Sequence, residues 1–151
     1  MSTPATISPR IIEGLYCEAL VLSDEVRAAF ALSGRLSRAG SEEDLARVAL
    51  SCEGLRTTTR MMHALAWLLN YRAYFLGEIS EFQLRRYGRL ANDHGGGGPD
   101  QQDMLDIPTR QLIAATERFY ARLQRLDLGW RERMPIAPGA IERVRVRVSG
   151  A

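Results

Sequence analysis

The chain has 151 residues, of which 46% are hydrophobic and 25% are charged, and its formal net charge is only +2. This balance is typical of one globular domain with its own core, and it excludes wholesale disorder and a dominant field for binding nucleic acid. All twenty basic residues are arginine. The absence of lysine excludes chemistry that needs a P-loop lysine or a lysine Schiff base.

No segment has the pattern of a secretion signal or a membrane span. The first ten residues, MSTPATISPR, lack a basic start and an apolar centre, and no apolar run reaches the roughly 18 residues that a bilayer requires. Cys17 and Cys52 lie in apolar helical patterns without CxxC spacing, which is typical of small buried thiols in a reducing compartment. We therefore expect a cytoplasmic protein without membrane contact or disulfides.

The first predicted helix covers about residues 9-33. Ser8 is placed to cap it, and Pro9 is tolerated at the first helical position. Its apolar residues recur at alternating spacings of three and four, which predicts one buried face. They are Ile12, Leu15, Ala19, Leu22, Val26 and Ala29.

The second predicted helix, about residues 41-76, is the longest. Ser41 is placed to cap it, and three acidic residues follow in the first turn, where they oppose the positive end of the helix dipole. Ten residues then keep the spacing of three and four without a break, and this periodicity of a helical bundle predicts that they face the core. They are Leu45, Val48, Cys52, Leu55, Thr59, Met62, Ala66, Leu69, Ala73 and Leu76.

A short third helix is predicted at about residues 80-90, where Ser80 and Gln83 have the spacing of a capping box. The composition of NDHGGGGPDQQ, residues 92-102, predicts a flexible loop.

Pro108 opens the last predicted helix, about residues 108-129. Its apolar series again steps by four and three, and it consists of Leu112, Thr116, Phe119, Leu123, Leu126 and Trp130. After Arg131 the helical pattern fails, because two prolines are followed by alternating arginine and valine. Residues 131-151 are therefore predicted to form a flexible tail with latent strand character.

These elements predict an all-α protein, an antiparallel three-helix bundle over residues 1-130 with an extra short helix. We also expect a homodimer, because the second helix has apolar residues off its main stripe that two neighbouring helices would not cover. They are Leu65, Trp67, Leu68, Tyr71 and Phe75.

A second series, the polar seam, runs beside the stripe of the second helix. It consists of Glu53, Arg56, Arg60, His63, Trp67, Asn70 and Tyr74. In an antiparallel hairpin about residues 34-40, Glu18 would lie near Arg56, and Glu13 with Tyr16 near Arg60. One interpretation is a set of interhelical ion pairs formed by Glu13, Glu18, Arg56 and Arg60.

The other interpretation is that the seam stays open to a partner protein, because aromatic residues beside arginines are typical of interaction hot spots. The candidate interaction residues are Arg56, Arg60, His63, Trp67 and Tyr71, together with Arg143, Arg145 and Arg147 of the tail.

No motif indicates catalysis, a cofactor or a metal. His63 and His94 are the only histidines, and neither has carboxylates or cysteines at ligand spacing. The GGGGP at 95-99 follows no strand and precedes no GK[ST], so it predicts a linker rather than a phosphate-binding loop. No nucleophile with a partner base is recognisable, and we expect no enzymatic activity.

Four runs carry a family resemblance: EGLYCEALVLSDEVR at 13-27, CEGLRTTTRMMHALAWLL at 52-69, GEI at 77-79 and RLQRLDL at 122-128. They resemble the alphaproteobacterial regulator of CtrA degradation (RcdA) family, over about residues 13-129. The most specific part is the E-x-x-R-x-T-x-R followed by W-L-L in the second helix.

The resemblance implies a dimeric three-helix bundle that works in the cytoplasm as a non-enzymatic accessory factor of the ClpXP protease. Family members deliver substrate proteins, including the cell-cycle regulator CtrA, together with a response regulator and a cyclic-di-GMP-binding partner. The alternative function is a DNA- or RNA-binding transcriptional regulator of cell-cycle genes, because Arg85, Arg86 and Arg89 form a small cluster.

Overall fold

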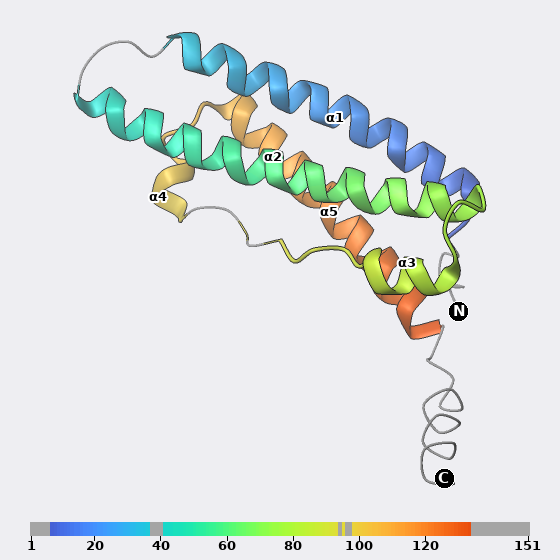
Figure 1. Ribbon diagram of the computed structural model, residues 1–151. Coiled ribbons are helices and arrows are strands. Elements are labelled where there is room, and N and C mark those ends of the chain that lie inside the picture. Colours follow the sequence, from blue (N-terminus) through green and yellow to red (C-terminus); the bar gives the residue numbers. More distant parts are fainter. Residues whose placement is uncertain (1–6, 37–40, 94, 96–97, 134–151) are drawn as a thin grey trace, which may run out of the picture.

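The computed structural model describes residues 7–36, 41–93, 95 and 98–133, and within them the only regular structure is helical (Figure 1). The predicted all-α class is therefore confirmed. No helix in the described part is both long and apolar enough to cross a bilayer.

In the part of the chain that the structure describes, three long helices form the bundle, and two short helices lie in the connection between the second and the last. They are α1 (Pro9–Leu36), α2 (Ser41–Phe75), α3 (Glu81–Tyr87), α4 (Pro99–Gln102) and α5 (Ile107–Arg133). The predicted helices match α1, α2, α3 and α5 to within about one turn at each end. The fourth helix, α4, lies in the segment predicted as a flexible loop, and it begins at a proline in the first helical position.

Helices α1 and α2 form an antiparallel hairpin, and α5 packs across both (Figure 1). Arg60 of α2 contacts Thr116, and Trp67, two turns later, contacts Asp127. Because the residue numbers rise along both helices from the first contact to the second, α5 runs in the same direction as α2. This direction is possible because the connection from α3 to α5 returns the chain along α2 to its other end. The predicted antiparallel arrangement is therefore correct for α1 and α2 but wrong for α5 and α2.

Local signals account for the helix ends around α3. Gly77, which follows α2, has a φ of +78°, a left-handed conformation that favours glycine. The Ser80 hydroxyl accepts from the Gln83 N–H, and the Gln83 side chain accepts from the Ser80 N–H. This is the predicted capping box.

The predicted buried faces of α1 and α5 are largely confirmed. Ile12, Leu15, Ala19 and Val26 of α1 are buried, while Leu22 is half-buried. In the predicted series of α5, Thr116, Phe119 and Leu123 are buried, while Leu112, Leu126 and Trp130 are half-buried. The expectation that both cysteines are buried is wrong. Cys17 is an exposed free thiol on α1, and Cys52 is only half-buried.

The predicted core stripe of α2 is wrong, because it faces away from the bundle. Six of its large apolar residues have 47–71% of their surface exposed. They are Leu45, Val48, Leu55, Met62, Leu69 and Leu76. The buried face is the one that carries the polar seam and the residues next to it, Glu53, Thr57, Arg60, Met61, Ala64, Trp67, Leu68 and Tyr71.

Two physical factors favour this face. Trp67 and Tyr71 are larger than the residues of the predicted stripe, so their burial removes more apolar surface from water. Arg60 can enter the core because other elements supply partners for its charge. Trp67, Leu68 and Tyr71 are therefore covered within one chain, and they do not supply the dimer surface that we inferred from them.

Two helical glycines predict opposite responses to alanine. A Cβ on Gly54 of α2 would lie 2.9 Å from Cδ1 of Phe30 on α1, whereas Gly14 of α1 has open space. Gly14→Ala should stabilise the protein by about 0.5–1 kcal/mol through the lower entropy of the unfolded chain. Gly54→Ala should destabilise it by about 1–3 kcal/mol because Phe30 must move. Urea unfolding measures the change in the free energy of unfolding for each variant. An equal increase in Gly14→Ala and Gly54→Ala would contradict the close packing of α1 on α2.

Candidate functional site

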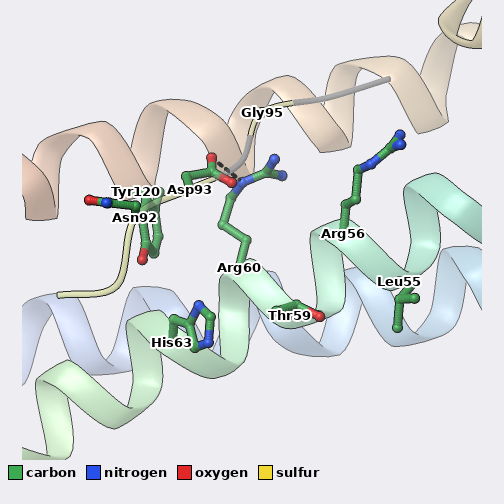
Figure 2. A pocket seen from close by; sticks show the side chains of 9 residues that line it. All are labelled: Leu55, Arg56, Thr59, Arg60, His63, Asn92, Asp93, Gly95 and Tyr120. Carbon is green, nitrogen blue, oxygen red and sulfur yellow. Dashed lines mark hydrogen bonds and ion pairs between the residues drawn. The ribbon is translucent and has the colours of Figure 1, made fainter. Parts of the chain in front are cut away.

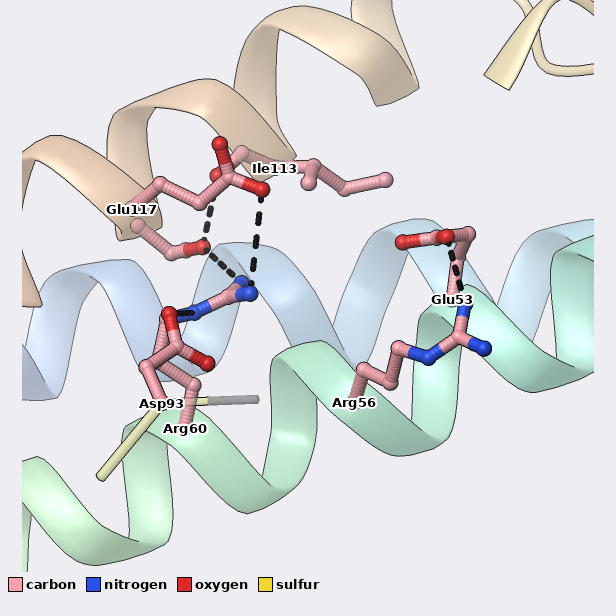
Figure 3. A network of polar contacts seen from close by, with 7 residues as sticks. Glu53, Arg56, Arg60, Asp93, Ile113 and Glu117 are labelled. Carbon is pink, nitrogen blue, oxygen red and sulfur yellow. Dashed lines mark hydrogen bonds and ion pairs between the residues drawn. The ribbon is translucent and has the colours of Figure 1, made fainter. Parts of the chain in front are cut away.

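Arg60 is the centre of a buried polar network (Figure 3). Its side chain is wholly buried, and its Nε lies 2.8 Å from Oδ2 of Asp93. Its Nη1 donates to the Thr116 hydroxyl at 3.1 Å, and its Nη2 lies 3.7 Å from Oε1 of Glu117. The Thr116 hydroxyl in turn donates to the Ile113 carbonyl at 2.7 Å. One guanidinium thus joins α2 to α5 and to the segment after α3.

Arg56 forms a second contact one turn earlier on α2. Its Nη1 lies 2.8 Å from Oε1 of Glu53, whose side chain is fully buried, and it also donates to Oε1 of Gln101 at 3.2 Å. Because Gln101 belongs to α4, this contact holds the short helix against α2. Arg56 itself remains about 39% exposed.

The predicted pairing of the two seam arginines with α1 is wrong. Glu13 pairs instead with Arg72, with 2.7 Å between Oε1 and Nε, and Glu18 pairs with Arg122 of α5. The cause is the rotation of α2, because the polar seam faces α5 and the returning connection rather than α1. All four predicted ion-pair residues form ion pairs, but with other partners.

Trp67 of the polar seam and Tyr71 beside it both contact α5. The Trp67 indole N–H donates to Oδ1 of Asp127 at 3.0 Å, and Arg131 of α5 lies 3.3 Å from the same carboxylate. The Tyr71 ring packs edge-on against Trp130, with 5.7 Å between the ring centroids. Burial raises the pKa of Tyr71, and the negative charge of Asp127 adds to the rise.

A hollow of about 220 Å³ lies beside Arg60 (Figure 2). Its lining residues come from α2, from the returning connection and from α5. They are Leu55, Arg56, Thr59, Arg60, His63, Asn92, Asp93, Gly95 and Tyr120. The hollow is smaller than the roughly 300–1,000 Å³ of typical ligand pockets, and the charges of both arginines are already paired. It therefore gives no argument for a small-molecule site.

Tyr120, which lines this hollow, predicts a loss of stability at high pH. Its hydroxyl donates to the Ala91 carbonyl, and burial, with a contribution from Asp93, raises the pKa of the phenol to about 12. The folded state therefore holds the proton more tightly than the unfolded chain, whose tyrosines ionise near pH 10.

The stability that this group supplies is complete below about pH 10 and falls as the pH rises towards 12. Ultraviolet titration of wild type and Tyr120→Phe should assign a late ionisation step to Tyr120. A wild-type titration in which every tyrosine ionises near pH 10 would contradict the burial of this ring.

The structure separates the predicted interaction residues. Arg60, Trp67 and Tyr71 are buried, so they do not form the open surface that one interpretation required. Arg56 and His63 are half-buried at the edge of the hollow. The tail arginines Arg143, Arg145 and Arg147, like His94 and the whole predicted tail after Arg133, lie outside the described residues.

Among the described residues no group of histidine, cysteine and carboxylate side chains could hold a metal ion. A family profile described as a protein of unknown function, DUF1465, matches residues 3–151. The chain belongs to the DUF1465 family. Comparison with curated proteins and with solved structures gives no significant match.

Two surfaces of this DUF1465 member were missed as candidate sites. The first is the outer stripe of α2, the ten residues listed above that were predicted to face the core. The second is the α3 face, formed by Phe82, Arg86, Tyr87 and Arg89, which are all exposed. Signals for both are present in the sequence, namely an unbroken period of 3.5 and two aromatic residues among clustered arginines.

Proposed function

We propose that this chain is a non-enzymatic cytoplasmic adaptor that brings substrate proteins to the ClpXP protease together with a response regulator. The residues that resemble the RcdA family support this role, and membership of DUF1465 is compatible with it. The structural observation that carries the proposal is the α3 face. This face carries aromatic and positively charged side chains that lie outside the core and can contact a partner.

The α3 face combines exposed aromatic rings with unneutralised charge. Phe82 and Tyr87 are 69% and 70% exposed, and the Arg86 guanidinium lies 5.5 Å from the centroid of the Tyr87 ring. Within the described residues no carboxylate lies within ion-pair distance of Arg86 or Arg89. Large exposed aromatics beside arginine are the composition of an interaction hot spot.

The inner side of α3 is anchored to the bundle. Leu84 points into the core, and Arg85 pairs with Glu81 at 3.1 Å, while its guanidinium lies 5.7 Å from the centroid of a Trp130 ring. The helix is therefore anchored by its inner side before any partner arrives, which lowers the entropic cost of binding. The free positive charges favour a partner segment that carries acidic residues around an apolar anchor.

The test is capture of ClpX and of a response regulator by tagged full-length protein in cells of the native organism. Phe82→Ala/Arg86→Glu should reduce capture at least about tenfold, because it removes an anchor and reverses a charge. Arg118→Glu, an exposed arginine on α5, makes the same charge change elsewhere and should leave capture intact. If the wild type captures neither protein, the adaptor function is wrong; if the α3 variant captures both normally, the α3 face is not the docking site.

The alternative function, binding to DNA or RNA, is favoured only by the exposure of Arg86 and Arg89, which lie three positions apart in the chain. Two exposed cations and a net charge of +2 give a weak field, so we expect no retention on nucleic acid near physiological salt. A DNA or RNA probe shifted by micromolar protein at that salt concentration would favour the alternative over the adaptor.

A further inference from the structure

The outer stripe of α2 is a long apolar surface that the described residues leave uncovered. Of its ten residues, from Leu45 to Leu76, eight are exposed and two, Cys52 and Ala73, are half-buried. At a rise of about 1.5 Å per residue the stripe is roughly 46 Å long. Apolar surface of this length on a globular protein marks an interaction site.

The period of the stripe specifies the shape of what covers it. A straight helix drifts by about 20° in each heptad relative to a period of 3.5, so an apolar series that keeps this period for more than four heptads follows a left-handed supercoil. Such a series packs best against another helix with an equally long stripe of the same period. A second α2 meets this requirement.

The residues that flank the stripe allow two copies to approach. Charged flanking residues are few, and Arg56 and Arg72 are already paired within the chain, with Glu53 and Glu13. The other flanking positions are mostly small or uncharged, such as Ser51, Thr58, Leu65, His63 and Asn70. Together with the stripe they supply roughly twenty residues a side, the lower end of a standard interface.

The sizes of the stripe residues select an antiparallel arrangement. Alternate positions are mostly small, namely Cys52, Thr59, Ala66 and Ala73, and the positions between them are larger, namely Val48, Leu55, Met62, Leu69 and Leu76. In an antiparallel pair each small residue of one outer stripe faces a larger residue of the partner's outer stripe, which fills space evenly. A parallel pair would place large against large and small against small.

One antiparallel register uses all ten residues. Leu45 then faces the partner's Leu76, and Leu55 faces the partner's Ala66. Thr59 faces the partner's Met62 beside the two-fold axis. The interface is therefore self-complementary, as a closed dimer requires.

We propose that the outer stripe of α2 is the surface on which two copies of the chain associate, with their α2 helices antiparallel. The association itself does not depend on the adaptor function. Its consequence does rest on that function: α3 follows the end of α2, so the two α3 faces would lie at opposite ends of the dimer (Figure 1). Two partners could then bind at once without a clash, which raises the avidity of the assembly.

Sedimentation of the full-length protein tests the association. Wild type should sediment as a dimer, at twice the 16.9 kDa of the chain. Met62→Glu should weaken association more than about 100-fold, because it places an unpaired charge between the two outer stripes. Val21→Glu changes an exposed apolar residue of α1 and should leave the dimer intact. A monomeric wild type, or a Met62→Glu protein that stays dimeric, overturns the proposal; circular dichroism verifies that both variants are folded.

Disulfide crosslinking tests the orientation. In a Cys17→Ser/Cys52→Ala background, oxidation of a mixture of Leu55→Cys and Ala66→Cys chains should give a crosslinked dimer, whereas neither variant alone should crosslink. Crosslinking of Leu55→Cys chains with one another, with no disulfide between positions 55 and 66 in the mixture, would show a parallel pair and overturn the antiparallel arrangement. Capture of ClpX by the monomeric Met62→Glu variant separates the two proposals, since the adaptor function can fail while the dimer persists, or the reverse.

Discussion

Arg60→Ala should lower the free energy of unfolding by about 3–5 kcal/mol, because it leaves the partners of a buried guanidinium without their cation. Asp93 and Thr116 bond to Arg60 at 2.8 Å and 3.1 Å, and the arginine side chain is wholly buried. Removing the side chain also opens a cavity between α2 and α5. The effect is measured by urea unfolding at neutral pH.

Arg122→Ala is the matched control for this variant. Arg122 also pairs with a carboxylate of another helix, Glu18, but both side chains are nearly half exposed. An exposed pair contributes at most about 1 kcal/mol, because water and salt screen the charges. Equal losses in Arg60→Ala and Arg122→Ala would contradict the buried network and restore the interpretation of the seam as an open surface.

Trp67→Ala should destabilise the protein by a similar amount, about 3–5 kcal/mol, because it removes the largest fully buried side chain among the described residues. Trp67→Phe keeps much of the volume but removes the N–H that Asp127 accepts. It should cost about 1–3 kcal/mol, although Arg131 still pairs with the carboxylate.

Thermal or urea unfolding, followed by circular dichroism rather than tryptophan fluorescence, compares the two Trp67 variants. Asp127→Asn changes the acceptor residue instead of the donor. It keeps an acceptor oxygen for the Trp67 N–H and weakens the ion pair with Arg131. A Trp67→Ala protein as stable as the wild type would show that the seam does not lie in the core. The contact of α2 with α5 would then be wrong.

The helical class and most helix ends could be predicted from local chemistry. Ser8 with Pro9 and the capping box of Ser80 each fix a boundary within a few residues of where they occur in the chain. Helix α4 was missed because a run of glycines precedes it and because one turn of helix is too short to show a period.

The buried face of α2 could not be predicted from its own sequence. Both series of α2 repeat at three and four residues, and the one that looks less apolar is buried because distant residues complete it. Asp93 is 33 positions from Arg60 and Thr116 is 56 positions away. Periodicity along one helix does not report such partners, and an arginine in a helix is normally expected to face water.

The partners of the seam residues could not be predicted for the same reason, because periodicity along one helix does not report residues from other elements. The seam was recognised as a group of related residues, but its partners and the register of the α1–α2 hairpin depend on how α2 is rotated. Glu13 meets Arg72 rather than Arg60 for this reason. A strict heptad was present in the outer stripe, but a heptad predicts a helical neighbour without stating whether that neighbour belongs to the same chain.

The most direct test of this account compares two adjacent methionines of α2. Met61 is 2% exposed and Met62 is 63% exposed, so the structure places one on the buried face and the other on the exposed face of the same helix. Urea unfolding at a protein concentration low enough to keep the chain monomeric should show a loss of about 2–5 kcal/mol for Met61→Ala. Met62→Ala should lie within about 0.5 kcal/mol of the wild type. A larger loss for Met62→Ala than for Met61→Ala would show that the outer stripe is the core face and would contradict the account.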